Sequence, residues 1–256
     1  MGSPRPARVQ AARSFQGSDS ERGAMNGEWA RGRRATAEGR IARAGRSRVV
    51  LATVLARWFL IFLLFVALGG RAWADYIPQD GDIVFQVSQS SQSAAIQAAT
   101  QSPYSHMGIV SVRDGVPFVL EAVQPVKLTP LGQWIARGER RHFVVKRLKN
   151  AAAVLTPETL RQMWAVAETF AGKDYDLQFG WSDDRIYCSE LVWKIYQRGA
   201  GVEIGALATL GTFDLSAPAV RAKLAERYGT KIPLEEIVIS PAAIFEAREL
   251  ETVFEQ

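Results

Sequence analysis

The 256-residue sequence contains one cysteine, Cys188, and two histidines, His106 and His142. A thiol, an imidazole and a group that orients the imidazole together make a nucleophilic site for acyl transfer, because the imidazole takes the thiol proton and later returns it to the leaving group. A single cysteine is also compatible with a buried, inert side chain that packs as a small hydrophobe. Which of these two interpretations applies depends on the helices and strands that surround Cys188.

The residues that follow Cys188 predict a helix. Apolar side chains recur at helical spacing through the segment Tyr187-Cys188-Ser189-Glu190-Leu191-Val192-Trp193-Lys194-Ile195-Tyr196, so Cys188 lies at or near the helix start. A helix N-terminus favours a thiolate, and its free N–H groups supply half of an oxyanion hole. Ser189 and Glu190 are expected to stabilise the helix start rather than to contact the substrate. This placement favours a nucleophile.

The dipeptide Asp114-Gly115 predicts a tight hairpin between the expected strands 107–112 and 116–123. A two-residue turn pairs Arg113 with Val116, which fixes the register of both strands. A four-residue loop would keep the same side chains on each face, whereas a three-residue loop would exchange the faces.

In that register Glu121 faces Gly108, and His106 lies diagonally from Glu121 on the same face of the ribbon. Diagonal neighbours have Cβ atoms about 7–8 Å apart, within reach of a glutamate and an imidazole, and glycine leaves room between them. Glu121 is also compatible with a solvated strand residue. His142, flanked by two arginines, is interpreted as a surface residue.

Strands and helices mix without a regular βαβ rhythm, which favours an α+β fold with an antiparallel sheet. Besides the hairpin, the expected strands are 82–87, 142–148 and 237–239, and the expected helices, apart from that at Cys188, are 91–101, 131–136, 157–170 and 241–249. Thr156 suits the N-cap of the helix 157–170. Residues 201–256 carry no recognisable motif.

An Arg-rich leader precedes this domain. Residues 58–68 are an uncharged apolar run after arginines, and Ala72-Trp73-Ala74 follows, which predicts a secretory signal peptide cleaved after Ala74. Met25 is an alternative start, and an uncleaved membrane anchor over 49–68 is the alternative to cleavage. Both place the single expected domain, residues 75–256, outside the cytoplasm, in the periplasm or the extracellular space.

Composition excludes several classes of protein. One cysteine cannot form an intrachain disulfide framework, and two histidines with one cysteine at these positions do not make a zinc site, so we expect no metal and no cofactor. The formal charge is +9 over residues 1–74 and −4 over residues 75–256. The basic character belongs to the leader, so we expect no nucleic-acid partner, and membrane contact only through an uncleaved leader.

The motifs together resemble a family. Ser105-His106-Met107-Gly108-Ile109-Val110, then Leu120-Glu121-Ala122, then Tyr187-Cys188-Ser189-Glu190-Leu191-Val192 resemble the permuted papain-like amidases, the YiiX/YaeF-like branch of the NlpC superfamily, as does the opening Gly81-Asp82-Ile83-Val84-Phe85. The resemblance implies a circularly permuted papain-like fold, with an antiparallel sheet or small barrel packed against helices. It implies that Cys188 is the nucleophile, His106 the general base and acid, and Glu121 the orienting residue. Tyr104 is a candidate oxyanion donor or pocket residue, and an ordinary packed tyrosine is the alternative.

The resemblance and the predicted export imply a cysteine amidase or endopeptidase that hydrolyses peptidoglycan peptides through a thioester on Cys188. Relatives with the same order of His and Cys act on acyl lipids, so a lipid-directed thiol acyl hydrolase or acyltransferase is a second hypothesis. A non-catalytic binding module is the third. An apolar channel beside Cys188 favours lipid, and a polar, charged groove favours peptide.

Overall fold

The computed structural model describes residues 76–256. The predicted leader, its cleavage site and the alternative anchor lie outside these residues. Within them, no helix is both long and apolar enough to cross a membrane. The strands are β1 (Ile83–Ser88), β2 (His106–Arg113), β3 (Val116–Glu121), β4 (Lys127–Pro130), β5 (Gly138–Leu148), β6 (Ala208–Thr209), β7 (Ile237–Val238) and β8 (Leu250–Glu255). The helices are α2 (Ser93–Thr100), α3 (Leu131–Arg137), α4 (Ala151–Val154), α5 (Pro157–Phe170), α6 (Cys188–Ala200), the 3₁₀ turn η1 (Leu210–Thr212), α7 (Pro218–Tyr228) and α8 (Pro241–Phe245).

Six strands form one antiparallel sheet in the order β4-β3-β2-β1-β5-β8. The short strands β6 and β7 pair separately. Strands β1 to β4 are neighbours in chain order, and β5 pairs with the free edge of β1. Strand β1 therefore lies inside the sheet, between β2 and β5. The predicted α+β class with an antiparallel sheet is confirmed.

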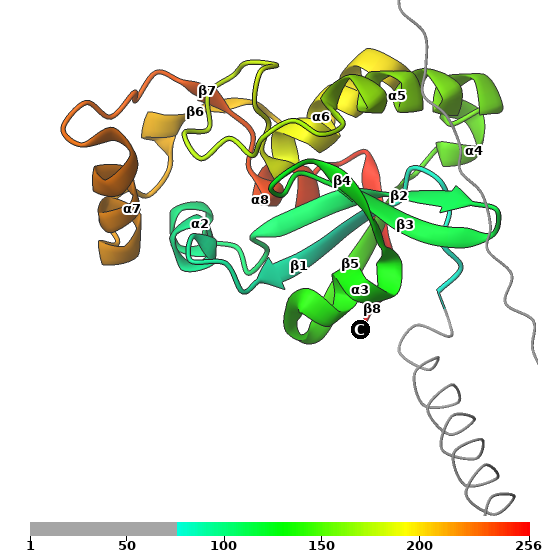
Figure 1. Ribbon diagram of the computed structural model, residues 1–256, viewed down its shortest axis with the longest axis horizontal. Helices are drawn as coiled ribbons and strands as arrows, with labels where there is room; N and C mark the ends of the chain where they lie inside the picture. The colour runs from blue at the N-terminus through cyan, green and yellow to red at the C-terminus, as the bar shows by residue number, and fades with distance from the viewer. Residues whose placement is uncertain (1–75) are drawn as a thin grey trace, which may run out of the picture. The chain divides into compact units, whose positions relative to one another are not determined.

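Alternate residues of the central strands face two different cores, as the period of two in a strand requires. Ile83 and Phe85 of β1 join the larger core, where α5 and α6 pack on the sheet. Val84 faces the opposite side and packs with Trp134 of α3. Figure 1 shows this arrangement, with α5 and α6 above the sheet and α3 below it. A third, smaller core joins α2 to α7 at one end of the sheet.

The β2–β3 hairpin has the predicted two-residue turn. Arg113 pairs with Val116, and both Asp114 (φ 50°) and Gly115 (φ 77°) are left-handed, as a turn that follows the strand twist requires. At Gly108 a Cβ atom would lie 2.5 Å from Val119 Cγ1 and 2.6 Å from the Leu120 carbonyl oxygen. Only glycine therefore fits opposite the end of β3.

Most helices predicted from the sequence are present, and Thr156 caps α5 by accepting a hydrogen bond from the Thr159 N–H at 3.2 Å. The helix predicted over 241–249 ends at Phe245, because the chain then turns to form the edge strand β8. The sequence pattern indicated neither β8 nor α7. Both carry many charged residues, and α7 packs largely on the small side chains of α2, so neither shows a strong apolar period.

Candidate active site

Cys188 is the first residue of α6 and is 2% exposed. Three contacts of its neighbours fix this helix start. The Ser189 hydroxyl donates to the Ile239 carbonyl oxygen at 2.8 Å, the Tyr187 N–H donates to Glu190 Oε2 at 3.4 Å, and the Ile239 N–H donates to the Tyr187 hydroxyl at 3.0 Å. Ser189 and Glu190 therefore hold the helix start, as predicted.

His106 opens β2 and Glu121 closes β3, so the hairpin brings the two side chains together. His106 Nε2 and Glu121 Oε2 are 2.6 Å apart, and Cys188 lies close enough to the imidazole to raise its pKa. The Trp134 ring stacks beside the imidazole, with 6.2 Å between ring centroids and 28° between the planes. The structure thus assembles Cys188, His106 and Glu121 into one chain of contacts.

Glu121 is fully buried, and both of its carboxylate oxygens have hydrogen-bond partners. Its Oε1 atom accepts a hydrogen bond from the Thr129 hydroxyl at 2.6 Å and another from the Arg137 guanidinium. Glu121 is therefore a buried, partnered carboxylate beside His106, and the alternative of a solvated strand residue is excluded. Sequence reasoning missed Thr129 and Arg137, which come from β4 and the end of α3, because no spacing in the sequence connects them to the hairpin.

The charges in this cluster support one another. Burial alone would lower the pKa of His106, but the neighbouring Cys188 and the hydrogen bond and negative charge of Glu121 raise the pKa to about 9. Burial would raise the pKa of Glu121, but His106, Thr129 and Arg137 outweigh it and hold that pKa below its usual range. At neutral pH the imidazole is therefore protonated and the carboxylate is ionised. This state provides the acid that a leaving amine needs.

Tyr104 lies outside this cluster. Its ring packs on Phe245, with centroids 4.3 Å apart, and on Phe85, with centroids 6.0 Å apart. Burial and the negative charges of Glu246 and Glu255 raise the pKa of Tyr104. Tyr104 lines neither of the two pockets described below. The packing makes Tyr104 a core residue, in place of the oxyanion donor that it was a candidate for.

A different tyrosine, Tyr175, reaches the thiol. Its hydroxyl accepts a hydrogen bond from Gln92 Nε2 at 2.9 Å, and Tyr175 and Cys188 line the same pocket, close enough for the charge of Cys188 to act on the hydroxyl. Burial and the charge of Cys188 raise the pKa of Tyr175 well above its ordinary value, so the hydroxyl keeps its proton. Arg227 of α7 in turn donates to Gln92 Oε1 at 2.6 Å. Tyr175 lies in a polar loop without periodicity, so no pattern in the sequence indicated a role for it.

The loop that carries Tyr175 is tied to the helix that carries Cys188. Lys194, on α6, is 1% exposed and contacts Glu190 Oε1 at 2.7 Å. The same ammonium donates to the Ser182 carbonyl oxygen and to Asp183 Oδ1, both at 2.8 Å. Burial raises the pKa of Glu190 to about 7, against the lowering effect of Lys194. This network fixes residues 182–183 of the loop to α6.

We expect Tyr175→Phe to lower kcat by about 10²-fold, because one hydrogen-bond donor to the developing oxyanion is lost. Tyr104→Phe is the matched control, since it removes the same atom from a tyrosine outside the site, and kcat is expected to stay within a factor of two. Steady-state kinetics of both variants measure this difference. Equal losses in the two variants would contradict the assignment of Tyr175.

The second histidine is outside the site, in line with the sequence interpretation. His142, on β5, has a side chain that is 38% exposed, and its Nε2 atom lies 4.0 Å from Glu255 Oε1. It lines neither pocket. His106 is therefore the histidine that the fold brings to Cys188.

Two pockets meet at the Cys188–His106 pair. The first, about 770 Å³ with its open mouth, includes Cys188 and is walled mainly by apolar side chains of α2, η1 and α7, among them Ala95, Ala99, Leu210, Leu215, Val220 and Leu224. The second is a broader groove, about 1420 Å³ with its open mouth, that includes His106 and is lined mainly by hydroxyl and amide side chains. Gln92 and Tyr175 line both pockets and separate them.

Comparison with known proteins agrees with this geometry. Residues 77–254 match the model of the family described as "Permuted papain-like amidase enzyme, YaeF/YiiX, C92 family". The "Uncharacterized protein YiiX" of Escherichia coli (strain K12) is 52% identical over 194 residues, which cover 76% of this chain and 93% of that protein. The structure named "Crystal structure of metalloprotein yiiX from Escherichia coli O157:H7, DUF1105" aligns with a TM-score of 0.68 at 52% identity, covering 71% of this chain and 99% of that chain.

The word metalloprotein in the name of that structure raises the question of a metal site. Among residues 76–256 no group of three or more His, Cys, Asp or Glu side chains is arranged to hold a metal ion. His106 and Glu121 are already engaged with each other and with Cys188, Thr129 and Arg137. The described residues therefore do not fit a resident metal, and no step below involves one.

Proposed function

Because the chain belongs to the permuted papain-like amidase family YaeF/YiiX, we propose that it is a cysteine hydrolase that cleaves the amide bond between an apolar acyl group and a polar amine. The observation that carries this proposal is the apolar pocket beside Cys188. The acyl group stays on the sulfur during the reaction, so it has to lie on the side of the pocket that includes Cys188. The amine has to lie beside His106, in the polar groove.

In the first half of the reaction, the Cys188 thiolate attacks the amide carbonyl carbon and a C–S bond forms. The N–H groups at the start of α6, which have no partner within the helix, and the Tyr175 hydroxyl stabilise the oxyanion. The His106 imidazolium gives its proton to the nitrogen, the C–N bond breaks, and the amine leaves. An acyl thioester on Cys188 remains.

In the second half, water gives a proton to His106 and its oxygen attacks the thioester carbonyl carbon. The C–S bond breaks, the carboxylic acid leaves, and the thiolate and imidazolium are restored. The sum is one amide and one water converted into one acid and one amine. Glu121 keeps the imidazole oriented and supports its positive charge in both halves.

The substrate preference is tested with N-acyl amides of one amine whose acyl chains run from acetyl to palmitoyl. We expect kcat/KM to rise with chain length, by about threefold to fourfold per added methylene at ~0.8 kcal/mol each, until the pocket is filled. Leu224→Arg, which places a charge in the apolar wall, is expected to remove this dependence while leaving the acetyl substrate unaffected. A rate that is independent of chain length in the wild type would contradict an acyl pocket.

Hydrolysis of peptidoglycan peptides is the second candidate function, and the observation that favours it is the polar groove beside His106. Digestion of purified peptidoglycan, with products identified by mass spectrometry, distinguishes the candidates. New wall peptides together with inert N-acyl amides would favour the peptide candidate. A folded protein that is inactive on both and has an unreactive thiol would favour the non-catalytic binding module.

Export of the domain, through the leader, is part of the same proposal. It is supported by the order of the charged, apolar and Ala-x-Ala segments in residues 1–74. N-terminal sequencing of the protein recovered from the periplasm or the medium tests it, with Asp75 expected as the first residue.

A further inference from the structure

We propose that Arg137 binds a carboxylate on the leaving amine, so that the substrates are N-acyl amino acids or short N-acyl peptides with a free C-terminal carboxylate. This inference rests on the proposed function, because it assigns the amine side of the same amide to the groove beside His106. It adds the substrate class and a residue that determines specificity.

Few charged side chains line the groove. The side chains that line it are mostly hydroxyls and amides, including Ser88, Ser90, Ser105, Gln89 and Gln124. Among the lining residues that the structure describes, none is aspartate or glutamate, and Arg137 and His106 are the only ones that can be cationic. An anionic group that enters the groove therefore meets Arg137 and no opposing carboxylate on its walls.

Arg137 is held in place while much of its guanidinium stays accessible. One nitrogen, Nη2, donates to Glu121 Oε1, and 45% of the side chain is exposed. Within residues 76–256 the guanidinium makes no other hydrogen bond, so most of its five N–H donors are available to a ligand. A planar guanidinium matches a carboxylate in a paired, bidentate geometry.

The distance from the chemistry suits an amino-acid residue. A single carboxylate group, that of Glu121, separates the imidazole from the guanidinium: Oε2 lies 2.6 Å from His106 Nε2, and Oε1 receives Arg137. One residue of extended chain spans about 3.3–3.6 Å. Because Nε2 is held by Glu121, the leaving nitrogen takes its proton from the other ring nitrogen, so a carboxylate on the second residue after the cleaved bond, about 7 Å along an extended chain, suits Arg137 better than one on the first.

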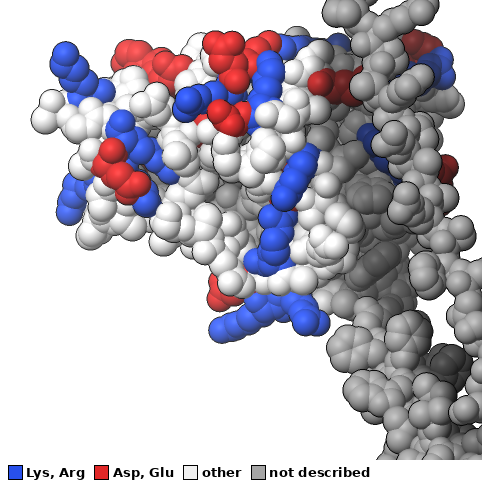
Figure 2. Space-filling view, viewed as in Figure 1, with Lys and Arg blue, Asp and Glu red and all other residues white. Residues whose placement is uncertain are grey.

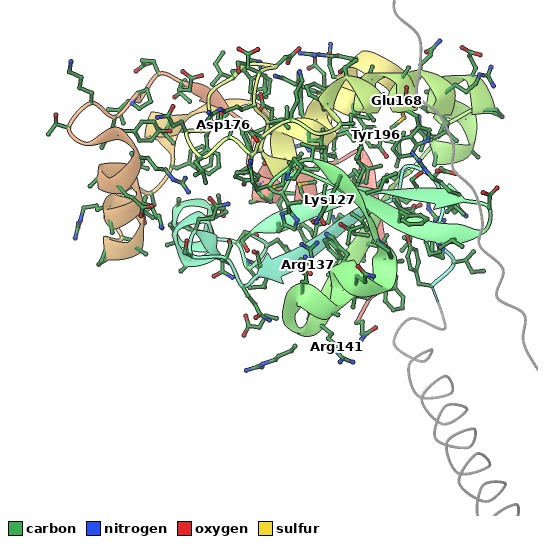
Figure 3. All side chains as sticks on the ribbon, in the orientation of Figure 1. Lys127, Arg137, Arg141, Glu168, Asp176 and Tyr196 are labelled. Carbon is green, nitrogen blue, oxygen red and sulfur yellow. The ribbon has the colours of Figure 1, made fainter. Side chains whose placement is uncertain are left out.

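The surroundings raise the positive potential at this end of the groove. Arg140 and Arg141 follow Arg137 closely and are both exposed, and Glu139 lies 4.0 Å from Arg140, so these three residues add one net positive charge. Figure 3 shows Arg137 between α3 and the sheet, with Arg141 below it, and Figure 2 shows basic side chains gathered at the same lower edge. These two arginines lie outside the groove lining, so they act on an anion through their field rather than by contact.

The test compares N-palmitoyl-alanine with N-palmitoyl-alaninamide, which differ only in the carboxylate, and includes the corresponding N-palmitoyl-alanyl-alanine pair. We expect the wild type to prefer the carboxylate of at least one pair by about 10- to 100-fold in kcat/KM, the range of a hydrogen bond to a charged group. Arg137→Gln is expected to bring that ratio close to one, and Arg137→Lys to give an intermediate ratio.

The ratio separates binding from positioning. If Arg137 only holds Glu121 in place, Arg137→Gln will lower kcat/KM for both members of a pair equally, and the proposal is overturned. Arg141→Gln is the matched control outside the groove, and it is expected to change the ratio by less than threefold. If Arg141→Gln lowers the carboxylate-to-amide ratio as much as Arg137→Gln does, the preference comes from the long-range field of the arginines and not from a binding site at Arg137.

Three further outcomes are distinguishable. A wild type that cleaves both members of each pair at the same rate overturns the carboxylate site and leaves the proposed hydrolase intact. A wild type that cleaves none of these N-acyl amides contradicts the proposed function itself. N-palmitoyl-phosphoethanolamine is included as a second anion, and faster cleavage of this phosphate than of the carboxylates overturns the assignment of an amino-acid substrate.

Discussion

Cys188→Ala is expected to lower kcat by roughly 10³- to 10⁶-fold, the scale observed when the nucleophile of a comparable catalytic triad is removed. The reason is that every covalent step passes through the sulfur, and Cys188 is the only cysteine in the sequence. Ala preserves the helix start, because Ser189, Tyr187 and Glu190 hold it through contacts that do not involve the thiol. The measurement is single-turnover and steady-state kinetics on the best N-acyl amide.

The same experiment has an internal control in the histidines. His106→Ala is expected to match the loss in Cys188→Ala, whereas His142→Ala is expected to retain full activity because His142 lines neither pocket. A thiol-directed probe, followed by mass spectrometry of the digested protein, reports whether Cys188 alone is modified. A Cys188→Ala variant that keeps more than a tenth of the wild-type activity would refute the thioester route.

Glu121→Gln is expected to lower kcat by about 10²- to 10⁴-fold and to shift the alkaline limb of the pH–rate profile to lower pH. In the wild type the imidazolium is lost as pH rises through about 9, the value to which Cys188 and Glu121 raise the pKa of His106. The glutamine removes one of those negative charges, so the ring loses its proton at lower pH. Kinetics from pH 5 to 10 measure both effects.

The same pKa makes a prediction for stability. A group whose pKa is raised by folding contributes stability that is fully present below its ordinary pKa of 6.5 and is lost as pH rises through about 9. The thermal midpoint of the wild type is therefore expected to fall over this interval, and by less in Glu121→Gln. If the alkaline limb of the pH–rate profile lies at the same pH in the wild type and in Glu121→Gln, Glu121 does not support the charge on His106.

Local rules predicted the part of the site that is local in the chain. The turn at Asp114-Gly115 fixed the register, and the register placed His106 and Glu121 on one face, with the space that Gly108 provides between them. The start of α6 was predicted equally well, because the apolar spacing that indicates a helix and the residues that begin it all lie within a few positions of Cys188.

The remainder of the site depends on contacts between segments that are distant in the sequence. Tyr175 reaches Cys188 from an irregular loop, and Arg137 reaches Glu121 from the end of a seven-residue helix. No periodicity or capping pattern encodes either contact, since both follow from how α3 and the loop pack on the sheet. Tyr104 shows the same limit, because it is close to His106 in the sequence but packs on Phe85 and Phe245, which is the alternative that the sequence left open.

The short β2–β3 hairpin also has a consequence for the order in which the site forms during folding. His106 and Glu121 are separated by 15 residues, whereas Cys188 arrives from a helix much later in the chain. Contacts between residues that are close in sequence form faster than distant ones, because less chain entropy is lost in closing the loop. We therefore expect the imidazole–carboxylate pair to form first and the thiol to gain its partner only when α6 docks. Until then Cys188 has no imidazole beside it, so the candidate site of a newly made chain is completed last.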